Sequence, residues 1–277
     1  MTKKKINNTE DISLENFNKL SIQVSLNGLS FCVLDTIGNT IIKSDRLIFE
    51  KNLSPNELQK NLEQLVKTHN LGSSQFSEVV VVHSNNLFSL VPKSLFNVNE
   101  LANYLKFNTK ILANDHIAYD ELDNYDIVNV YVPFVNINNY VFDLFGEFVY
   151  KHNGTVLIQA LLNNSGANKD PICYVHIEGH QMDITIITQK KLLFYNSFII
   201  TSKEDFIYYL LFTLEQLKLD TERTKLQLLG SIEEGDDMYN LCYKYIKDIS
   251  LFIPSVGLYP MAITDKKSLD FTVLSAL

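Results

Sequence analysis

The chain has 277 residues, of which 46% are hydrophobic, so it can bury one large core or two cores of ordinary size. A formal net charge of −8 argues against a protein that tracks nucleic acid strands, because such proteins present a face rich in Lys and Arg. No stretch approaches the roughly 18 consecutive apolar residues of a membrane span, so we expect none.

The amino-terminal residues and the cysteines predict a cytoplasmic protein. Residues 1–18 are interpreted as a flexible tail, since the basic run Lys3–Lys5 is not followed by the apolar segment of a secretory signal. Cys32, Cys173 and Cys242 are isolated in the sequence, which favours reduced, buried thiols over disulfides or a zinc site.

The first half is expected at residues 19–135, as three antiparallel strands followed by alternating helices and strands. Ser54-Pro55-Asn56-Glu57 predicts a helix start, with Ser as the N-cap, Pro at the first helical position and Glu three residues after the cap. The elements expected are a hairpin at 22–34, a strand at 40–49, a helix after Ser54, a strand at 78–82, a helix at about 99–107 and a strand at 127–133.

A connecting segment at 136–170 separates this half from the second, which is expected at 171–277. The connecting segment is interpreted as a helix at about 138–151, a strand at 155–162 and a turn-rich linker. The elements expected in the second half are a hairpin at 175–187, a strand at 192–200, a helix after a capping box at 201–204, a strand at 226–229, a helix at about 236–247 and a strand at 250–254.

The two hairpins indicate that the chain repeats itself. Residues 22–34, IQVSLNGLSFCVL, align without gaps on residues 175–187, VHIEGHQMDITII, and the apolar positions and the polar turn coincide. The elements that follow come in the same order in both halves. The sequence therefore predicts an α/β fold of two duplicated units, each a mixed five-stranded sheet covered by helices.

The duplicated unit resembles the actin-like ATPase (RNase H-like) fold. Within that class, the stretches FSLVPKSLF at 88–96 and YLKFN at 104–108 resemble an uncharacterised bacterial family, distantly similar to PilM and FtsA. In ATP-using members of the class, the turn of each hairpin cradles phosphate and carries an Asp followed closely by Gly. Gly lets backbone N–H groups approach the phosphate, and Asp holds the metal or its water shell.

Both turns of this chain depart from that pattern. Ser25 and His176 stand where the resemblance expects Asp, and Glu178 stands where it expects Gly. A carboxylate aimed at a triphosphate repels it unless a cation intervenes. The candidate phosphate-loop positions, all degenerate, are Ser25, Asn27, Gly28, His176, Glu178, Gly179 and His180.

The adenosine side implied by the resemblance is also incomplete. Gly230, Ser231 and Gly257 are the candidate positions there, and no GxxxxGK or GxGxxG motif occurs in the chain. Four acidic residues follow at 233–237, without the alternating oxygen ligands of a calcium loop.

Two catalytic or metal interpretations compete with the lost-activity interpretation. His176, Glu178 and His180 would share one face of a continuous strand and could hold a metal, but the repeat alignment places His180 in a turn, so we expect no metal. His83 and Ser84 could form a nucleophile pair, although no third partner has motif spacing and an ordinary polar loop is favoured.

The sequence thus favours a cytoplasmic, non-catalytic interaction or scaffold protein with a degenerate actin-like ATPase fold, no cofactor and a protein partner that the sequence does not identify. The alternative is a nucleotide-binding protein that holds ATP with magnesium in the cleft between the halves, with weak or no hydrolysis. A third hypothesis is an enzyme of unrelated chemistry in that cleft.

Overall fold

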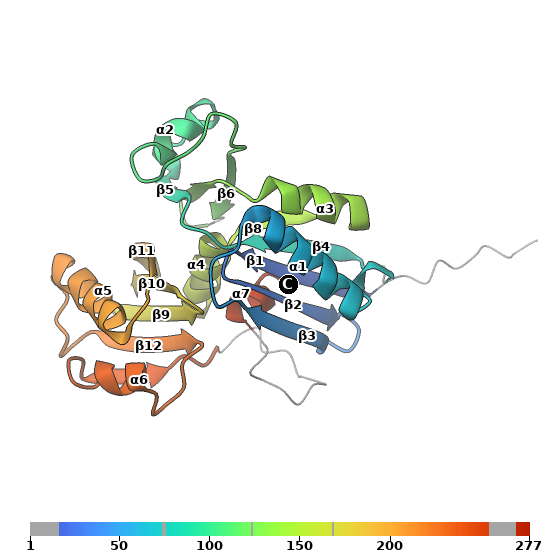
Figure 1. Cartoon of the computed structure of the whole chain (residues 1–277). Helices are drawn as coiled ribbons and strands as arrows, with labels where there is room; N and C mark the ends of the chain where they lie inside the picture. Colours follow the sequence, from blue (N-terminus) through green and yellow to red (C-terminus); the bar gives the residue numbers. More distant parts are fainter. Residues whose placement is uncertain (1–16, 74–75, 123, 168, 255–269) are drawn as a thin grey trace, which may run out of the picture.

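The computed structural model describes residues 17–73, 76–122, 124–167, 169–254 and 270–277 (Figure 1). The expected tail at 1–18 lies almost wholly outside the described residues, and the first strand already begins at Asn18. Two five-stranded sheets lie side by side, and a smaller three-stranded sheet lies beside both. The α/β fold class and the two mixed sheets predicted from the sequence are confirmed.

The first sheet has the order β3-β2-β1-β4-β8, in which β1, β2 and β3 are antiparallel while β4 and β8 run parallel to β1. Helices α1 and α3 cover one face of this sheet, where Leu62 and Val141 are fully buried against Ile22 and Phe31. Its elements are β1 (Asn18–Ser25), β2 (Gly28–Asp35), β3 (Thr40–Ile48), α1 (Pro55–Thr68), β4 (Glu78–His83), α3 (Val135–Phe145) and β8 (Val149–His152).

The second sheet repeats this arrangement with the order β11-β10-β9-β12-β13. Helices α5 and α6 cover one of its faces, with Phe206 and Cys242 fully buried there. Its elements are β9 (Ile172–Glu178), β10 (Gln181–Thr188), β11 (Lys191–Ile199), α5 (Lys203–Gln216), β12 (Lys225–Gly230), α6 (Asp237–Cys242) and β13 (Asp248–Leu251).

The two hairpins have the same register. Ile22 pairs with Phe31 in the first sheet, and the aligned residues Val175 and Ile184 pair in the second. Even the bulge recurs, between Val33 and Leu34 in one copy and at the aligned positions 186 and 187 in the other. The sequence alignment therefore identifies residues in equivalent positions of the two sheets.

Helices α4 (Asn153–Asn164) and α7 (Phe271–Ser275) lie between the two sheets (Figure 1). Leu157 and Leu161 of α4 contact Tyr174 and Ile187 of the second sheet, and α4 also packs on β4 of the first sheet through Val156. Val273 of α7 packs with Cys32 and its neighbours in the first sheet. The two helices close both cores, and the described carboxy-terminal residues 270–277 pack on the first sheet.

Three element predictions were wrong. The fifth strand of the first sheet is β8, whereas the segment expected in that place, at 127–133, forms β7 (Ile127–Tyr131) of the separate small sheet. Residues 155–162 form helix α4 instead of a strand. The predicted helix at 138–151 ends at Phe145, because Gly146 follows with φ of 78°, a helix-stopping conformation.

The mistaken strand at 155–162 has a physical reason. Its run of apolar and β-branched residues is typical of a buried strand, but a helix buried on most of its surface has the same composition. The side chain of His152 caps α4 by accepting a hydrogen bond from the Gly154 N–H at 3.0 Å. A histidine cap is absent from the usual start signals, so the helix start was missed.

The helix caps were predicted closely. Ser54 and Glu57 form the reciprocal capping box of α1, with the Ser54 N–H donating to the Glu57 carboxylate at 2.8 Å. The second helix start is one residue later than expected: Ser202 accepts from the Asp205 N–H, and Asp205 accepts in return from Thr201. In both helices a Ser side chain at the N-cap accepts a hydrogen bond from the backbone N–H three residues later.

The three-stranded sheet belongs to a small subdomain, residues 84–134, which is inserted between β4 and α3. Its sheet has the order β5-β7-β6, so β7 is central and the other two strands are edges. Its elements, besides β7, are β5 (Phe88–Pro92), α2 (Leu101–Leu105), β6 (Ala118–Leu122) and the short 3-10 helices Lys93–Leu95 and Val98–Glu100. A third such helix, Leu71–Ser73, follows α1.

None of the helices among the described residues is both long and apolar enough to cross a membrane. The three cysteines are buried and free, as expected. Aromatic residues at 134–150 pack mainly against the first core, with Phe142 as the exposed exception.

Candidate functional site

The turns of the two equivalent hairpins meet between the halves. Gly179 lies in the β9–β10 turn, and a Cβ added to it would lie 3.5 Å from Asn27 Nδ2 in the β1–β2 turn. The tips of the two candidate phosphate loops are therefore neighbours. His180 lies at the tip of the second turn, as the alignment predicted, and is exposed.

The polar groups of the first turn are bonded to one another. Ser25 Oγ donates to Asn27 Oδ1 at 2.6 Å and lies 3.0 Å from the Gly28 carbonyl oxygen. A Cβ on Gly28 would lie 2.9 Å from the Leu47 carbonyl oxygen, so the neighbouring strand occupies the space that a glycine leaves. These three candidate residues form a closed hairpin end rather than an open phosphate cradle.

A cavity of about 280 Å³ lies beside the two turns. This volume is just below the roughly 300–1,000 Å³ typical of small-molecule pockets. It is lined by Ser25, Leu26, Asn27, Asn52, Ser84, Asn85, Asn86, Leu87, Phe134, His180, Gln181 and Ile199. Among the described residues, the lining holds no Lys, Arg, Asp or Glu.

Arg46 of β3 crosses from the first half to the second. Its Nη2 lies 2.5 Å from Glu178 Oε2, and the same nitrogen donates a hydrogen bond to Ser231 Oγ. The Arg46 and Glu178 side chains are only 12% and 14% exposed. The guanidinium thus joins two candidate positions, one from the phosphate side and one from the adenosine side, and occupies the space between them.

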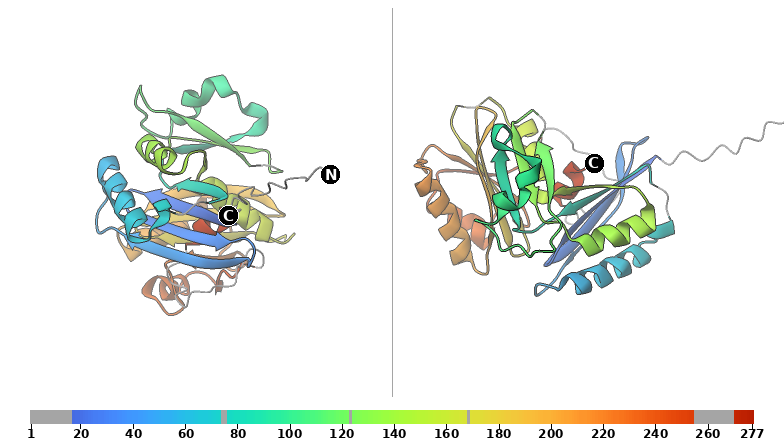
Figure 2. Two further views of the ribbon diagram at one scale, coloured as in Figure 1. Left: turned by 90° about the vertical axis from the view of Figure 1, so that its right-hand side faces the viewer. Right: turned by 90° about the horizontal axis from the view of Figure 1, so that it is seen from above.

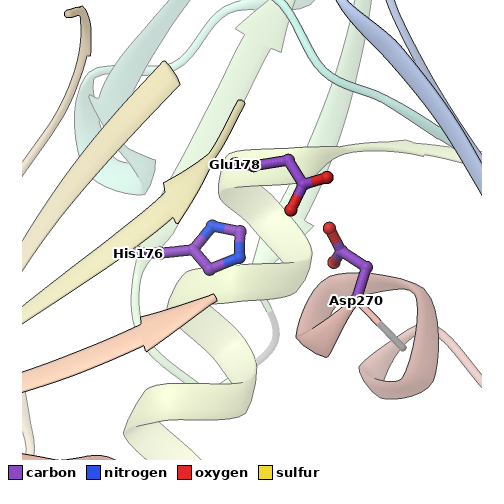
Figure 3. A group of neighbouring side chains, drawn as sticks. All are labelled: His176, Glu178 and Asp270. Carbon is purple, nitrogen blue, oxygen red and sulfur yellow. The ribbon is translucent and has the colours of Figure 1, made fainter. Parts of the chain in front are cut away.

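Glu178 belongs to a cluster of three side chains with His176 and Asp270 (Figure 3). Their potential ligand atoms all lie within 4.8 Å of one another. His176 and Glu178 come from β9, and Asp270 immediately precedes α7, where its carboxylate accepts from the Thr272 N–H at 2.7 Å and caps the helix. Asp270 Oδ2 also accepts from Gln23 Nε2 of β1 at 3.1 Å, so the cluster joins both halves.

Burial and mutual charge perturb these groups. Burial and the Asp270 charge raise the pKa of Glu178 well above its ordinary value, although Arg46 opposes the shift. Burial alone would raise the pKa of Asp270, but the His176 charge and hydrogen bonds from Glu178 and Thr272 outweigh it and lower the pKa. Burial lowers the pKa of His176, but its hydrogen bond to Asp183 and the nearby carboxylates outweigh burial, and the net shift is upward.

Asp183 orients His176 from the side opposite the cluster. His176 Nδ1 lies 3.5 Å from Asp183 Oδ2, and both residues are 1% exposed. Three further donors hold the Asp183 carboxylate, namely Asn153 Nδ2 at 3.0 Å, Gln181 Nε2 at 3.1 Å and Tyr195 OH at 3.4 Å. The imidazole is therefore fixed with its other nitrogen toward Glu178 and Asp270 (Figure 3).

The three candidate residues of the adenosine side, Gly230, Ser231 and Gly257, do not form one site among the described residues. Gly230 ends β12 with φ of 90°, and an added Cβ would lie 2.1 Å from the Ile177 carbonyl oxygen, so glycine is required here by the chain's own packing. The next N–H, from Ser231, donates to that oxygen at 2.7 Å. Gly257 lies outside the described residues.

His83 and Ser84 do not pair as nucleophile and base. His83 Nε2 bonds Asn138 Oδ1 at 2.8 Å and Nδ1 accepts from the Phe134 N–H at 3.2 Å, so both ring nitrogens are engaged. Ser84 Oγ donates to Gln181 Oε1 at 3.2 Å. Hydrogen bonds thus tie the end of β4 to α3 and the loop after β4 to β10.

The sequence pattern missed two members of this site. Asp270 is far from His176 in the chain and lies outside the hairpin motifs. Arg46 is one of several partly buried residues of β3, and no sequence pattern sets it apart from them. The only available signal was the helix-capping pattern Asp270-Phe-Thr-Val, which indicates a helix start but not its neighbours.

The architecture is that of the actin-like ATPase fold. A Bacteroides thetaiotaomicron VPI-5482 protein with actin-like ATPase fold and unknown function is similar, with a TM-score of 0.75 and 24% identity over 87% of this chain and 93% of that chain. The structure of the PilM–PilN type IV pilus biogenesis complex also matches, with a TM-score of 0.55 and 12% identity over 93% of both chains. At these identities the likeness shows the fold alone.

The chain belongs to the family described as "Protein of unknown function (DUF3822)", whose model matches residues 7–249. No curated protein matches the sequence. The resemblance to an uncharacterised bacterial family with this fold, distantly similar to PilM, is thereby confirmed.

Proposed function

We propose that the protein is a non-catalytic interaction protein of the cytoplasm, in which the actin-like fold serves to bind another protein and not to hydrolyse ATP. The three buried free thiols support a reducing compartment. The observation that carries the proposal is the bridge from Arg46 to Glu178 and Ser231, which fills the space between the two candidate halves of a nucleotide site.

The bridge argues against nucleotide for two reasons. A triphosphate approaching the second turn would have to displace the guanidinium from Glu178, and breaking a buried ion pair by separating its partners costs about 3–5 kcal/mol. Once displaced, the Glu178 carboxyl group would face the phosphates with no positive charge beside it. The closeness of the two turns and the small cavity, whose described lining holds no Lys or Arg to bind phosphate, support the same conclusion.

The surface of the small subdomain supports a protein partner. Single exposed apolar residues are common, but several on one small unit are typical of interaction surfaces. Five large apolar side chains of this subdomain are exposed: Leu95 by 69%, Val98 by 52%, Phe107 by 84%, Leu112 by 65% and Tyr119 by 40%. Both outer strands of its sheet are edges as well.

One neighbour in fold supports the same kind of role. The PilM structure was solved as a PilM–PilN complex, so a protein of this fold binds a protein partner. We extend only this general property to the present chain.

Partner capture from the source cell tests the proposal. The wild-type protein is compared with Leu95→Ser and Phe107→Ser, which change exposed side chains and should leave the fold intact. Tyr208→Ser is the matched control, because Tyr208 is 59% exposed but lies on α5 of the second half.

The expected result is a protein that is enriched with the wild type and with Tyr208→Ser and is reduced at least about tenfold with the subdomain variants, a loss of about 1.4 kcal/mol. The same enrichment with all variants, or no enrichment over a tag-only control, would contradict the proposal.

A further inference from the structure

We propose that His176, Glu178 and Asp270 form a binding site for a divalent transition-metal cation, of which Zn²⁺ is the suitable probe. This site is independent of the proposed partner binding. From the sequence we expected no metal here, because the repeat alignment places His180, the third candidate ligand beside His176 and Glu178, in a turn, where the structure also has it. Asp270 supplies the third donor instead.

The geometry permits coordination with small movements. The three ligand atoms lie within 4.8 Å of one another. Two ligands bound at about 2.1 Å to one ion lie no more than about 4.2 Å apart, so shifts of about 1 Å bring these side chains into range. Figure 3 shows the imidazole and both carboxyl groups converging on a common space.

His176 offers a donor atom that is free to bind. Its side chain is 1% exposed, and its Nε2 has no hydrogen-bond partner among the described residues. Glu178 Oε2 lies 2.5 Å from the Arg46 guanidinium, so a cation would share this oxygen with Arg46. A buried polar atom without a partner costs roughly 1–3 kcal/mol, and a bound cation would satisfy His176 Nε2.

The surroundings of His176 are those of a metal-ligating histidine. A ligating imidazole normally donates its second nitrogen to a carboxylate, which fixes the tautomer and turns the lone pair toward the metal. Asp183 occupies that place, 3.5 Å from His176 Nδ1, and is itself held by Asn153, Gln181 and Tyr195. His176, Asp183 and Asn153 of this network are each about 1% exposed.

The donor set selects the class of cation. An imidazole nitrogen with two carboxylates suits Zn²⁺, Mn²⁺ or Fe²⁺ better than Mg²⁺ or Ca²⁺, which prefer oxygen ligands throughout. The carboxyl groups of Glu178 and Asp270 face the common space with one guanidinium, from Arg46, beside them, and a bound divalent ion would favour their ionised form. Arg46 weakens the site by sharing Glu178.

A bound cation would join the halves. His176 and Glu178 lie at the end of β9 in the second sheet, and Asp270 is tied through Gln23 to β1 in the first. A ligand that binds only the folded state raises the melting temperature by mass action, so the site predicts metal-dependent stability.

The test uses the full chain without a histidine tag, stripped of metal with a chelator. Zn²⁺ is titrated by calorimetry with parallel thermal melts, and Co²⁺ is added to record its visible absorption bands. Glu178→Gln and His176→Gln remove one donor each, and Glu178→Gln keeps the size of the side chain so that the variant folds. His180→Asn is the matched control, since His180 lies two residues beyond Glu178 but outside the cluster.

The expected result is one Zn²⁺ per chain with a rise in melting temperature, affinity reduced at least about tenfold in Glu178→Gln and His176→Gln, and unchanged affinity in His180→Asn. The Co²⁺ bands of the wild type should be lost in His176→Gln. Absence of saturable Zn²⁺ binding by the wild type overturns the proposal. So does a Glu178→Gln variant that binds as the wild type does, or a His180→Asn variant that loses affinity equally.

Discussion

Two buried histidines predict that acid destabilises the folded protein. His83 and His152 are 0% and 1% exposed. In each ring Nδ1 accepts a backbone N–H, from Phe134 and from Gly154, while Nε2 bonds an oxygen, of Asn138 and of Asn85. Protonation of Nδ1 would break a hydrogen bond and place a charge in the core, so both rings are neutral in the folded state.

The magnitude follows from the pKa values. Burial lowers the pKa of His83 from 6.5 to about 3 and that of His152 to about 4, with hydrogen bonds to Asn138 and Asn85 opposing the shift. Because the folded pKa lies below the unfolded one, this contribution is fully present above about pH 6.5 and is lost as pH falls toward the folded pKa. At pH 5 each histidine costs about 2 kcal/mol relative to pH 7.5, so the two together cost about 4 kcal/mol.

Urea unfolding between pH 7.5 and 5 measures this effect, with His83→Gln as the test variant. Glu178 and Asp120, whose pKa values burial raises, act in the opposite direction, so the difference between wild type and variant is the informative quantity. Replacing His83 should remove about half of the acid loss. Phe134→Leu is the control, because it removes packing against His83 but no titratable group. An acid loss of equal size in wild type and His83→Gln would refute the reasoning.

Three further changes test the packing and the caps by urea unfolding. Gly230→Ala should destabilise by about 2 kcal/mol or more, because the added Cβ meets the Ile177 carbonyl oxygen at a backbone with positive φ; an unchanged midpoint would contradict this. Leu161→Ala in α4 should cost about 2–5 kcal/mol, since Leu161 is fully buried, whereas Phe142→Ala, 60% exposed, should change stability by less than about 0.5 kcal/mol. Ser54→Ala should cost about 1 kcal/mol by removing the capping box of α1, and a cost indistinguishable from zero would show that the cap is redundant.

The sheets could be predicted because their signals are local. Alternating apolar residues, Gly and Asn turns and capping residues specify the strands and helix starts. The residues that align between 22–34 and 175–187 also occupy equivalent pairs in the two hairpins. The place of a strand in a sheet depends on contacts distant in sequence. For that reason β7 was assigned to the first sheet, although it pairs with β5 and β6.

The site could be predicted only in part for the same reason. His176 and Glu178 were found because the resemblance directs attention to the second hairpin turn. Their contacts with Arg46 and Asp270 arise from the packing of β3 and α7 across the two halves, which no local pattern encodes. His180 shows the limit of spacing arguments, since a turn removes it from the face that its number implies, and only the repeat alignment placed it correctly.

Calorimetric titration of the full chain with ATP and Mg²⁺ tests whether the Arg46–Glu178 bridge and the neighbouring hairpin turns exclude nucleotide from the space between the halves. We expect no saturable heat and no rise in melting temperature at ATP concentrations up to about 1 mM. Saturation at micromolar ATP would contradict this expectation and would establish the nucleotide-binding alternative.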